Sequence, residues 1–323
     1  MGDIVLDPPE EQLAARDLHA LIDRWLLSLK VAEITRVSYR VKIAHFVDWW
    51  AIQGPLRDWQ LTQSGLFEFE VYLRSVVTER FNAPLSYSTR HSIMQALRMM
   101  FRWAATTNRT MKNYGEWVPW PDGATPQRKS ATPDQLIRLM VAALDSRQPI
   151  RDQAILAFFI GTGCRQSEVA SLNTDDLQIL ADGAGTAMVT GKRTKANPMG
   201  IRAVAFDAVT GRYLVRYMDA LVVERGPLWI NDEGEKLQAP GIYQMVKRTV
   251  KRAGLSEQIK GCHDLRRAFA TILGLLYPDS PTWADMIRRQ LGHKHYAMTA
   301  HYTLIEVDDI RDRIVTPLSL KTL

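Results

Sequence analysis

The sequence predicts a mainly α-helical chain of two domains, a helical bundle followed by an α-rich domain with a small antiparallel β-sheet. Three observations lead to this prediction. Apolar residues recur at three- and four-residue intervals through the first 115 residues, a proline-rich stretch interrupts the pattern, and two short β-type runs stand among helical segments after it. A chain of 323 residues has the length of about two domains.

The first domain, residues 16–115, is expected to be a helical bundle that follows an acidic N-terminal tail over 1–15. The first three helices cover about 18–29, 35–50 and 63–78. The fourth is long, and either Ser86 or Ser88 provides its N-cap. Its expected buried face consists of Ile93, Leu97, Met100, Phe101 and Ala104.

A linker is expected over residues 116–131. The stretch 117–133 holds four prolines and a glycine. Proline removes a backbone donor and restricts the residue before it, so neither a helix nor a sheet should persist here. The domain boundary is therefore placed in this stretch.

The second domain, residues 132–323, is expected to open with a helix that has Thr132 as N-cap and Pro133 at its first position. A largely apolar helix follows at 151–160. The remaining expected elements are a hairpin of 186–190 with 201–206 around a long basic tip, further helices, and a C-terminal tail over 303–323.

Composition excludes several classes of protein. The chain is 46% hydrophobic and 24% charged, as in ordinary globular proteins. No apolar run approaches the roughly 18 residues that a membrane span needs, and the acidic start is unlike a signal peptide, so a cytoplasmic location is expected. Cys164 and Cys262 are too few for a disulfide framework and lack the C-x-x-C spacing of zinc sites. Neither a metal nor another cofactor is expected.

Positive charge is concentrated in one part of the chain. The net charge is +6, which is compatible with a polyanionic partner. Residues 1–70 carry seven basic and eleven acidic side chains, whereas residues 71–130 carry nine basic and three acidic ones. The late part of the first domain is thus expected to present a basic patch.

Four separated elements of the second domain carry candidate chemistry. They are GTGCRQSE at 161–168, the hairpin tip with Lys192, Arg193 and Lys195, HDLR at 263–266, and LGH at 291–293 with Tyr302 nine residues later. The i,i+3 spacing brings Arg165 near Glu168 and places His263 and Arg266 on one helix face. Each element alone has an ordinary structural interpretation, as a solvated ion pair, a charged turn, a surface helix or a core tyrosine.

In combination, these elements resemble the signature of the tyrosine recombinase (phage integrase) family, and the chain is similar to its simple two-domain members of the Xer and Cre type. The resemblance covers residues 131–305, and the helical first domain resembles the family's SAM-like core-binding domain. It implies a site-specific DNA recombinase or integrase that cleaves and rejoins strands through a covalent 3′-phosphotyrosyl intermediate, without metal or ATP.

The resemblance also implies roles around the phosphate. Arg165 and Arg266 would hold the non-bridging oxygens, which gain charge in the transition state, with two guanidinium forks that keep their own charge. His293 would donate a further hydrogen bond. Glu168 would orient its neighbours rather than take part in the chemistry.

By the same resemblance, Tyr302 is the nucleophile, and Tyr296 is disfavoured because it lies only three residues after His293. His263 would act as general base or acid. The hairpin lysine would protonate the leaving 5′-oxygen. Lys192 follows a glycine as in Xer-type members, whereas Lys195 matches the arrangement in Cre; both are kept, with a slight preference for Lys195.

Double-stranded DNA is the expected partner. Contacts to it are expected from Arg90, Arg98 and Arg102 on the fourth helix, from Arg193, and from Lys247 and Lys251 in a basic stripe that could equally be a solvated face. In relatives a terminal helix docks onto a neighbouring protomer, which suggests exchange of the C-terminal segment within a homotetramer on nucleoid DNA. The oligomeric state without DNA is left open, with a monomer as one alternative. An accessory factor or partner recombinase is left open.

Two other functions fit parts of the pattern. A type IB topoisomerase uses a similar set of Arg, Lys, Arg, His and Tyr residues. The helical first domain and the motifs HDLR and LGH favour the recombinase. A non-catalytic DNA-binding regulator is disfavoured because the sequence retains a residue of the expected type at each catalytic position. A metal site formed by His293, His295 and His301 is disfavoured because i,i+2 spacing does not place the first two on one helix face.

Overall fold

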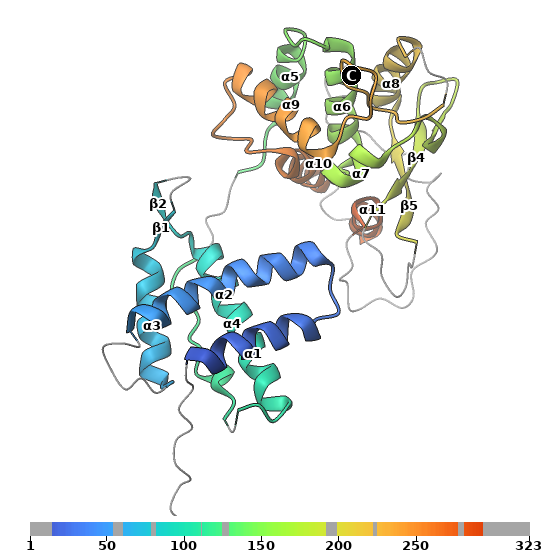
Figure 1. Cartoon of the computed structure of the whole chain (residues 1–323). Coiled ribbons are helices and arrows are strands. Elements are labelled where there is room, and N and C mark those ends of the chain that lie inside the picture. The colour runs from blue at the N-terminus through green and yellow to red at the C-terminus, as the bar shows by residue number, and fades with distance from the viewer. Residues whose placement is uncertain are drawn as a thin grey trace, which may run out of the picture. The chain divides into compact units, whose positions relative to one another are not determined.

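The computed structural model describes residues 15–53, 61–78, 82–110, 112–124, 129–191, 199–221, 225–276 and 281–292. The chain divides into two compact units, Met1–Gln127 and Arg128–Leu323, and each has its own hydrophobic core (Figure 1). Helices dominate both units and the sheets are small and antiparallel, so the predicted fold class is confirmed.

The described residues of the first unit form four α-helices and a minimal β-pair. Its elements are α1 (Ala15–Ser28), α2 (Glu33–Gln53), α3 (Gln63–Ser75), β1 (Val77–Thr78), β2 (Ala83–Pro84), α4 (Tyr87–Thr106) and the 3₁₀ turn η2 (Tyr114–Glu116). Ser86 rather than Ser88 caps α4, since its hydroxyl accepts from the Thr89 N–H at 3.2 Å. All five predicted core residues of α4 are buried.

Two expectations for the first unit need correction. The third helix was expected to reach Thr78, but it ends at Ser75, and Thr78 lies in the β1 strand opposite Ala83. The unit is therefore not purely helical. The cause is local, because Val76, Val77 and Thr78 are all β-branched and favour extended backbone.

The first part of the predicted linker packs onto α4. Val118 is buried in the core of the first unit, and Trp117 packs against that core. The Trp120 ring stacks on His91 at 4.7 Å between centroids, and the Arg98 guanidinium lies 4.2 Å from the same ring. Apolar and aromatic side chains thus hold this stretch although its prolines prevent regular structure.

The second unit surrounds one buried helix. Its elements are α5 (Pro133–Ala142), α6 (Pro149–Thr162), α7 (Gln166–Ser171), the 3₁₀ turn η3 (Thr174–Asp176), β3 (Leu177–Ile179), β4 (Gly185–Thr190), β5 (Ile201–Phe206), α8 (Ala208–Asp219), α9 (Ala239–Arg252), α10 (Cys262–Leu276) and α11 (Pro281–Leu291). The predicted start of α5 is confirmed, with Thr132 and Gln135 capping each other reciprocally and Pro133 in the first turn. Helix α6 is buried on nearly all sides because α5, α8, α10 and β5 contact it.

The three-stranded sheet has the order β3-β4-β5 and is antiparallel throughout. The predicted hairpin is present as β4 and β5, with Thr190 opposite Ile201. The short strand β3 was not predicted. Helix α11 contacts both β5 and α10, which brings the end of the described chain beside the sheet. Within the described ranges, no helix has the length and apolarity that a membrane crossing requires.

Candidate active site

A glycine turn places Arg165 at the start of a helix. Helix α6 ends at Thr162, and Gly163 reverses the chain with a φ of 63°, in the left-handed region that glycine tolerates best. Arg165 is then the N-cap residue of α7. Its backbone N–H donates to Glu168 Oε2 at 2.7 Å, and its Nη1 lies 2.9 Å from Glu168 Oε1. The predicted pairing of Arg165 with Glu168 is therefore present.

Arg266 reaches the same turn from α10. Its side chain is buried, with Nη1 donating to the Gly163 carbonyl at 2.8 Å and Nη2 donating to the Leu291 carbonyl at 2.6 Å. His263, in the first turn of the same helix, is exposed. The structure thus brings Arg165 and Arg266 together at one turn, as the sequence motifs predict.

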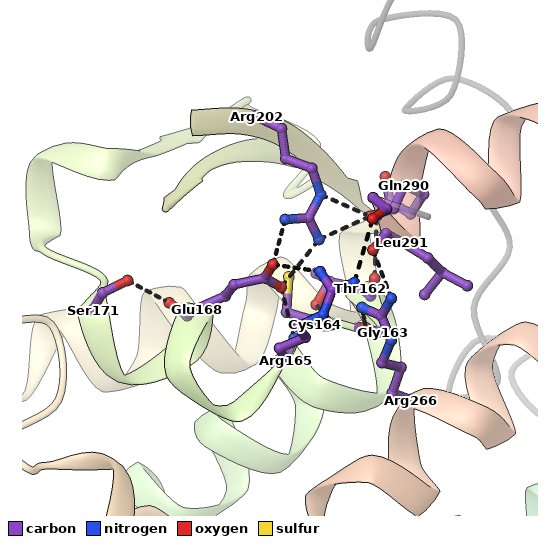
Figure 2. A network of polar contacts seen from close by, with 11 residues as sticks. Thr162, Gly163, Cys164, Arg165, Glu168, Ser171, Arg202, Arg266, Gln290 and Leu291 are labelled. Carbon is purple, nitrogen blue, oxygen red and sulfur yellow. Dashed lines mark hydrogen bonds and ion pairs between the residues drawn. The ribbon is translucent and has the colours of Figure 1, made fainter. Parts of the chain in front are cut away.

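Two residues that sequence analysis missed complete the network in Figure 2. Arg202 on β5 pairs with the fully buried Glu168 carboxylate, with Nη1 at 2.7 Å from Oε1 and Nη2 at 3.1 Å from Oε2. Gln290, at the end of α11, is also buried and binds the backbone of Ala205. The sequence held one signal for Arg202, which is the charged residue of an otherwise apolar strand. A charged side chain that such a strand buries needs a buried partner.

The network carries more positive than negative charge. Burial works against the Glu168 anion, but the hydrogen bonds and charges of Arg202 and Arg165 outweigh it, so the pKa of Glu168 lies below its usual value. Burial, together with the nearby charge of Arg165, lowers the pKa of Arg266 to about 10. The network sets three guanidinium groups against one carboxylate, so two positive charges remain to attract an anion such as a phosphate.

The other predicted site residues fall into two groups. Lys192, Arg193, Lys195, His293 and Tyr302 lie outside the described residues. Among the predicted DNA contacts, Arg102 and Lys251 are exposed, Arg98 and Lys247 are half-buried, and the Arg90 guanidinium lies against the buried Glu70 carboxylate. Within the described part of the chain, no group of three or more His, Cys, Asp or Glu residues could hold a metal ion.

Comparison with known proteins decides the family. Residues 129–308 match the model of the phage integrase family, a match that covers more than half of the chain and the whole glycine turn, sheet and α10 region. The chain belongs to the phage integrase family. The resemblance predicted from the motifs is confirmed, and the chain is a tyrosine recombinase.

The curated relatives of this tyrosine recombinase match it over most of its length. It is 26% identical over 309 residues to "Tyrosine recombinase XerC 2" of Ralstonia nicotianae, covering 95% of this chain and 86% of that protein. It is also 26% identical over 307 residues to "Tyrosine recombinase XerD" of Bifidobacterium longum, covering 93% and 94%. The similarity therefore includes both units.

Solved structures share its fold. The XerH site-specific recombinase bound to its difH substrate aligns with a TM-score of 0.65 at 18% identity, over 90% of this chain and 92% of that one. A lambda integrase tetramer bound to a Holliday junction aligns with a TM-score of 0.62 at 19% identity, over 90% and 80%. At these identities the comparison shows the fold.

Proposed function

We propose that this protein is a site-specific recombinase that cleaves and rejoins DNA through a covalent bond between Tyr302 and a 3′-phosphate. The observation that carries the proposal is the convergence of Arg165 and Arg266 on one turn with surplus positive charge, in a chain of the tyrosine recombinase family. Phosphodiester cleavage places negative charge on the non-bridging oxygens, and fixed guanidinium groups stabilise that charge.

The proposed cleavage step needs neither a metal ion nor ATP, because side chains of the protein supply and accept the protons. The Tyr302 oxygen attacks phosphorus, the bond from phosphorus to the 5′-oxygen breaks, and a proton passes to that oxygen from Lys195 or Lys192. His263 takes the tyrosine proton. A free phenol has a pKa of about 10, so forming phenolate at neutral pH costs about 4 kcal/mol, which nearby positive charge offsets. The phosphotyrosine ester conserves the bond energy, and a 5′-hydroxyl reseals the strand.

Family membership favours recombination over the alternatives. The match to the phage integrase model, together with relatives named tyrosine recombinases, favours strand exchange over type IB topoisomerase relaxation and over a non-catalytic regulator. A homotetramer on two DNA duplexes is the proposed assembly, supported by the shared fold with a lambda integrase tetramer on a Holliday junction. The exposed Arg102 and Lys251 are proposed to contact phosphates.

Covalent trapping tests the proposal directly. The substrate is a library of duplexes with a randomised core and a nick beside it. Cleavage next to the nick releases a short oligonucleotide that carries the 5′-hydroxyl. Without that hydroxyl the strand is not resealed, so the protein stays attached to it. We expect wild-type protein to form a denaturant-resistant complex and to select one duplex, hereafter the selected duplex. Tyr302→Phe should bind that duplex without forming the complex, because only the reacting oxygen is lost.

Tyr296→Phe is the matched control, since it removes a phenol six residues away and should still form the complex. The released strand should carry a 5′-hydroxyl, shown by direct labelling with polynucleotide kinase. A complex formed by Tyr302→Phe, or lost in Tyr296→Phe, would contradict the assignment of the nucleophile.

The leaving group identifies the general acid. A 5′-bridging sulfur in place of oxygen leaves as a thiolate, whose conjugate acid has a pKa of about 8.5, so it needs little help from an acid. We expect Lys195→Ala to slow cleavage of the oxygen substrate by about 10²–10⁴-fold and to cleave the sulfur substrate nearly as fast as wild type. Lys192→Ala is the control, and the reverse result would assign the role to Lys192.

A further inference from the structure

The C-terminal end of α11 is held by three arginines that come from three different elements. The Gln290 carbonyl accepts from Arg202 on β5, the Leu291 carbonyl accepts from Arg266 on α10, and the Gly292 carbonyl accepts from Arg165 at the start of α7. The last carbonyls of a helix have no partner within the helix, and cations are favourable at this end. The end of α11 and the arginine cluster are therefore one structural unit.

Arg202 occupies the middle of this unit because it binds both Glu168 and α11. Its Nη1 and Nη2 reach the two carboxylate oxygens of Glu168, while its Nε and Nη2 reach the Gln290 carbonyl at 3.3 and 3.2 Å. Figure 2 shows the guanidinium lying between these partners. The same Glu168 carboxylate binds the backbone and side chain of Arg165.

The Gln290 side chain makes a second connection between α11 and β5. Its Oε1 accepts from the Ala205 N–H at 3.0 Å, and its Nε2 donates to the Ala205 carbonyl at 2.7 Å. The Arg202 side chain thus binds the Gln290 backbone, and the Gln290 side chain binds the β5 backbone. Four hydrogen bonds in two directions fix the strand against the helix end.

Arg202 has little capacity left for a DNA phosphate. A guanidinium has five N–H donors, and four hydrogen bonds to protein atoms already use most of them. Within the described residues, the side chains of Arg165 and Arg266 each make only two such hydrogen bonds, so both keep donors for a phosphate. Arg165 can therefore face a substrate, whereas Arg202 is directed at the residues that hold Arg165.

We propose that Arg202 is a positioning residue for strand cleavage, which holds the Glu168 carboxylate and the end of α11 so that Arg165 and Arg266 keep their orientation toward the phosphate. This inference rests on the proposed function. It assigns Gln290 to the same task, because Gln290 fixes the strand from which Arg202 projects. Displacement of a catalytic group by about 1 Å is enough to slow a reaction about 10²-fold.

The test measures cleavage of the selected duplex in a single turnover at saturating protein, together with the dissociation constant for the same duplex. We expect Arg202→Ala to lower the cleavage rate at least tenfold and to leave the dissociation constant within about threefold of wild type. The cleavage rate of Arg202→Lys should lie between those of wild type and Arg202→Ala, since lysine keeps the charge and lacks the planar guanidinium group. Gln290→Met, which keeps the side-chain length without the amide, should slow cleavage in the same way.

Arg151→Ala is the matched control for loss of a buried ion pair. Arg151 is also buried, pairs with Asp152 at 2.9 Å and donates to the Ile230 carbonyl, but it belongs to none of the contacts around Glu168. We expect it to lower the thermal unfolding midpoint while cleavage of bound DNA keeps the wild-type rate. The Glu168→Gln/Arg202→Ala double variant should lose less than the two single losses combined, because both act through one interaction.

Four results would overturn the proposal. These are an Arg202→Ala rate within twofold of wild type, an equal loss in Arg151→Ala, a loss explained by weaker DNA binding, and additive losses in the double variant. If Arg202→Ala does not fold, Arg202→Lys and Gln290→Met decide by the same criteria. If wild-type protein forms no covalent complex, the proposed function itself is contradicted. This inference, which rests on that function, is then contradicted as well.

Discussion

In the part of the chain that the structure describes, each unit buries one glutamate between two arginines, and the two clusters differ in what surrounds them. In the first unit, Glu70 is 1% exposed and lies 2.6 Å from Arg74 and 2.5 Å from Arg90. In the second unit, Glu168 is 0% exposed and lies 2.9 Å from Arg165 and 2.7 Å from Arg202. The local chemistry is the same, since one buried carboxylate compensates two guanidinium groups.

The difference lies in the third charged partner. In the first unit a second carboxylate, Asp122, pairs with Arg74 at 3.1 Å, so two cations meet two anions. In the second unit the third partner is another cation, Arg266, and the remaining acceptors are neutral carbonyls at the end of α11. A balanced cluster joins helices, whereas an unbalanced cluster of the same kind also attracts an anion.

The largest expected effect comes from removing the surplus cation. Arg266→Ala should slow cleavage of the selected duplex by about 10²–10³-fold, because it removes a donor to the charge that develops in the transition state. Arg266→Lys keeps a charge and should lose less. Arg74→Ala, in the balanced cluster, should leave the single-turnover rate of bound DNA unchanged. Equal losses in the Arg266 and Arg74 variants would contradict the distinction between the clusters.

Removing the carboxylate tests the same distinction through stability and pH. Glu168→Gln leaves three cations without an anion and should lower the free energy of unfolding by about 3 kcal/mol at pH 7, measured by urea titration. The folded pKa of Glu168 lies below the reference value of 4.5, so its contribution is present above that pH and is lost as the pH falls through the folded pKa.

Wild-type protein should therefore lose more stability than Glu168→Gln between pH 7 and pH 3.5. Glu70→Gln serves as the comparison, because it should destabilise the first unit and leave cleavage of bound DNA unaffected. Parallel stability curves for wild type and Glu168→Gln would show that this carboxylate is not held as an anion by its arginines.

The smallest expected effect distinguishes two arginines of α4: Arg90, which is paired with a carboxylate, and Arg102, which is exposed. Arg102 is exposed, whereas Arg90 is bound by Glu70 and by the Asp122 carbonyl. We expect Arg102→Ala to reduce the slope of log K against log salt for DNA binding by about 0.9, the value for one phosphate contact. Arg90→Ala should lower the unfolding midpoint and keep the slope. A changed slope in Arg90→Ala would show that Arg90 also contacts phosphate.

Sequence reasoning found the parts of the site that depend on short spacing. Arg165 and Glu168 lie within a single turn, so i,i+3 geometry was sufficient to relate them. The same spacing joins His263 and Arg266, but in the structure His263 is exposed whereas Arg266 is buried. Arg202 and Gln290 were missed because their contacts depend on the register of β5 and on where α11 ends against it. Arg202 is opposite Val189 in that register, which turns it toward the buried side of the sheet.

The same limit applies to the fold. Helix periodicity and capping residues located α4 and α5 well, since both signals are local. The early end of α3 is also local in origin, because the β-branched residues that follow Ser75 favour extended backbone and pair with β2. Tertiary packing decided the fate of the linker, since burial of Val118 attached part of a proline-rich stretch to the first unit.

The turn at Gly163 lies against side chains of both α10 and α11. A Cβ atom at this position would lie 2.6 Å from the Phe269 ring and 2.7 Å from the Leu291 side chain, and its φ of 63° already disfavours any other residue. An added Cβ atom would have to displace the Phe269 or the Leu291 side chain, next to the Leu291 carbonyl that Arg266 binds. A residue without a side chain thus limits which substitutions this turn tolerates, within two residues of Arg165.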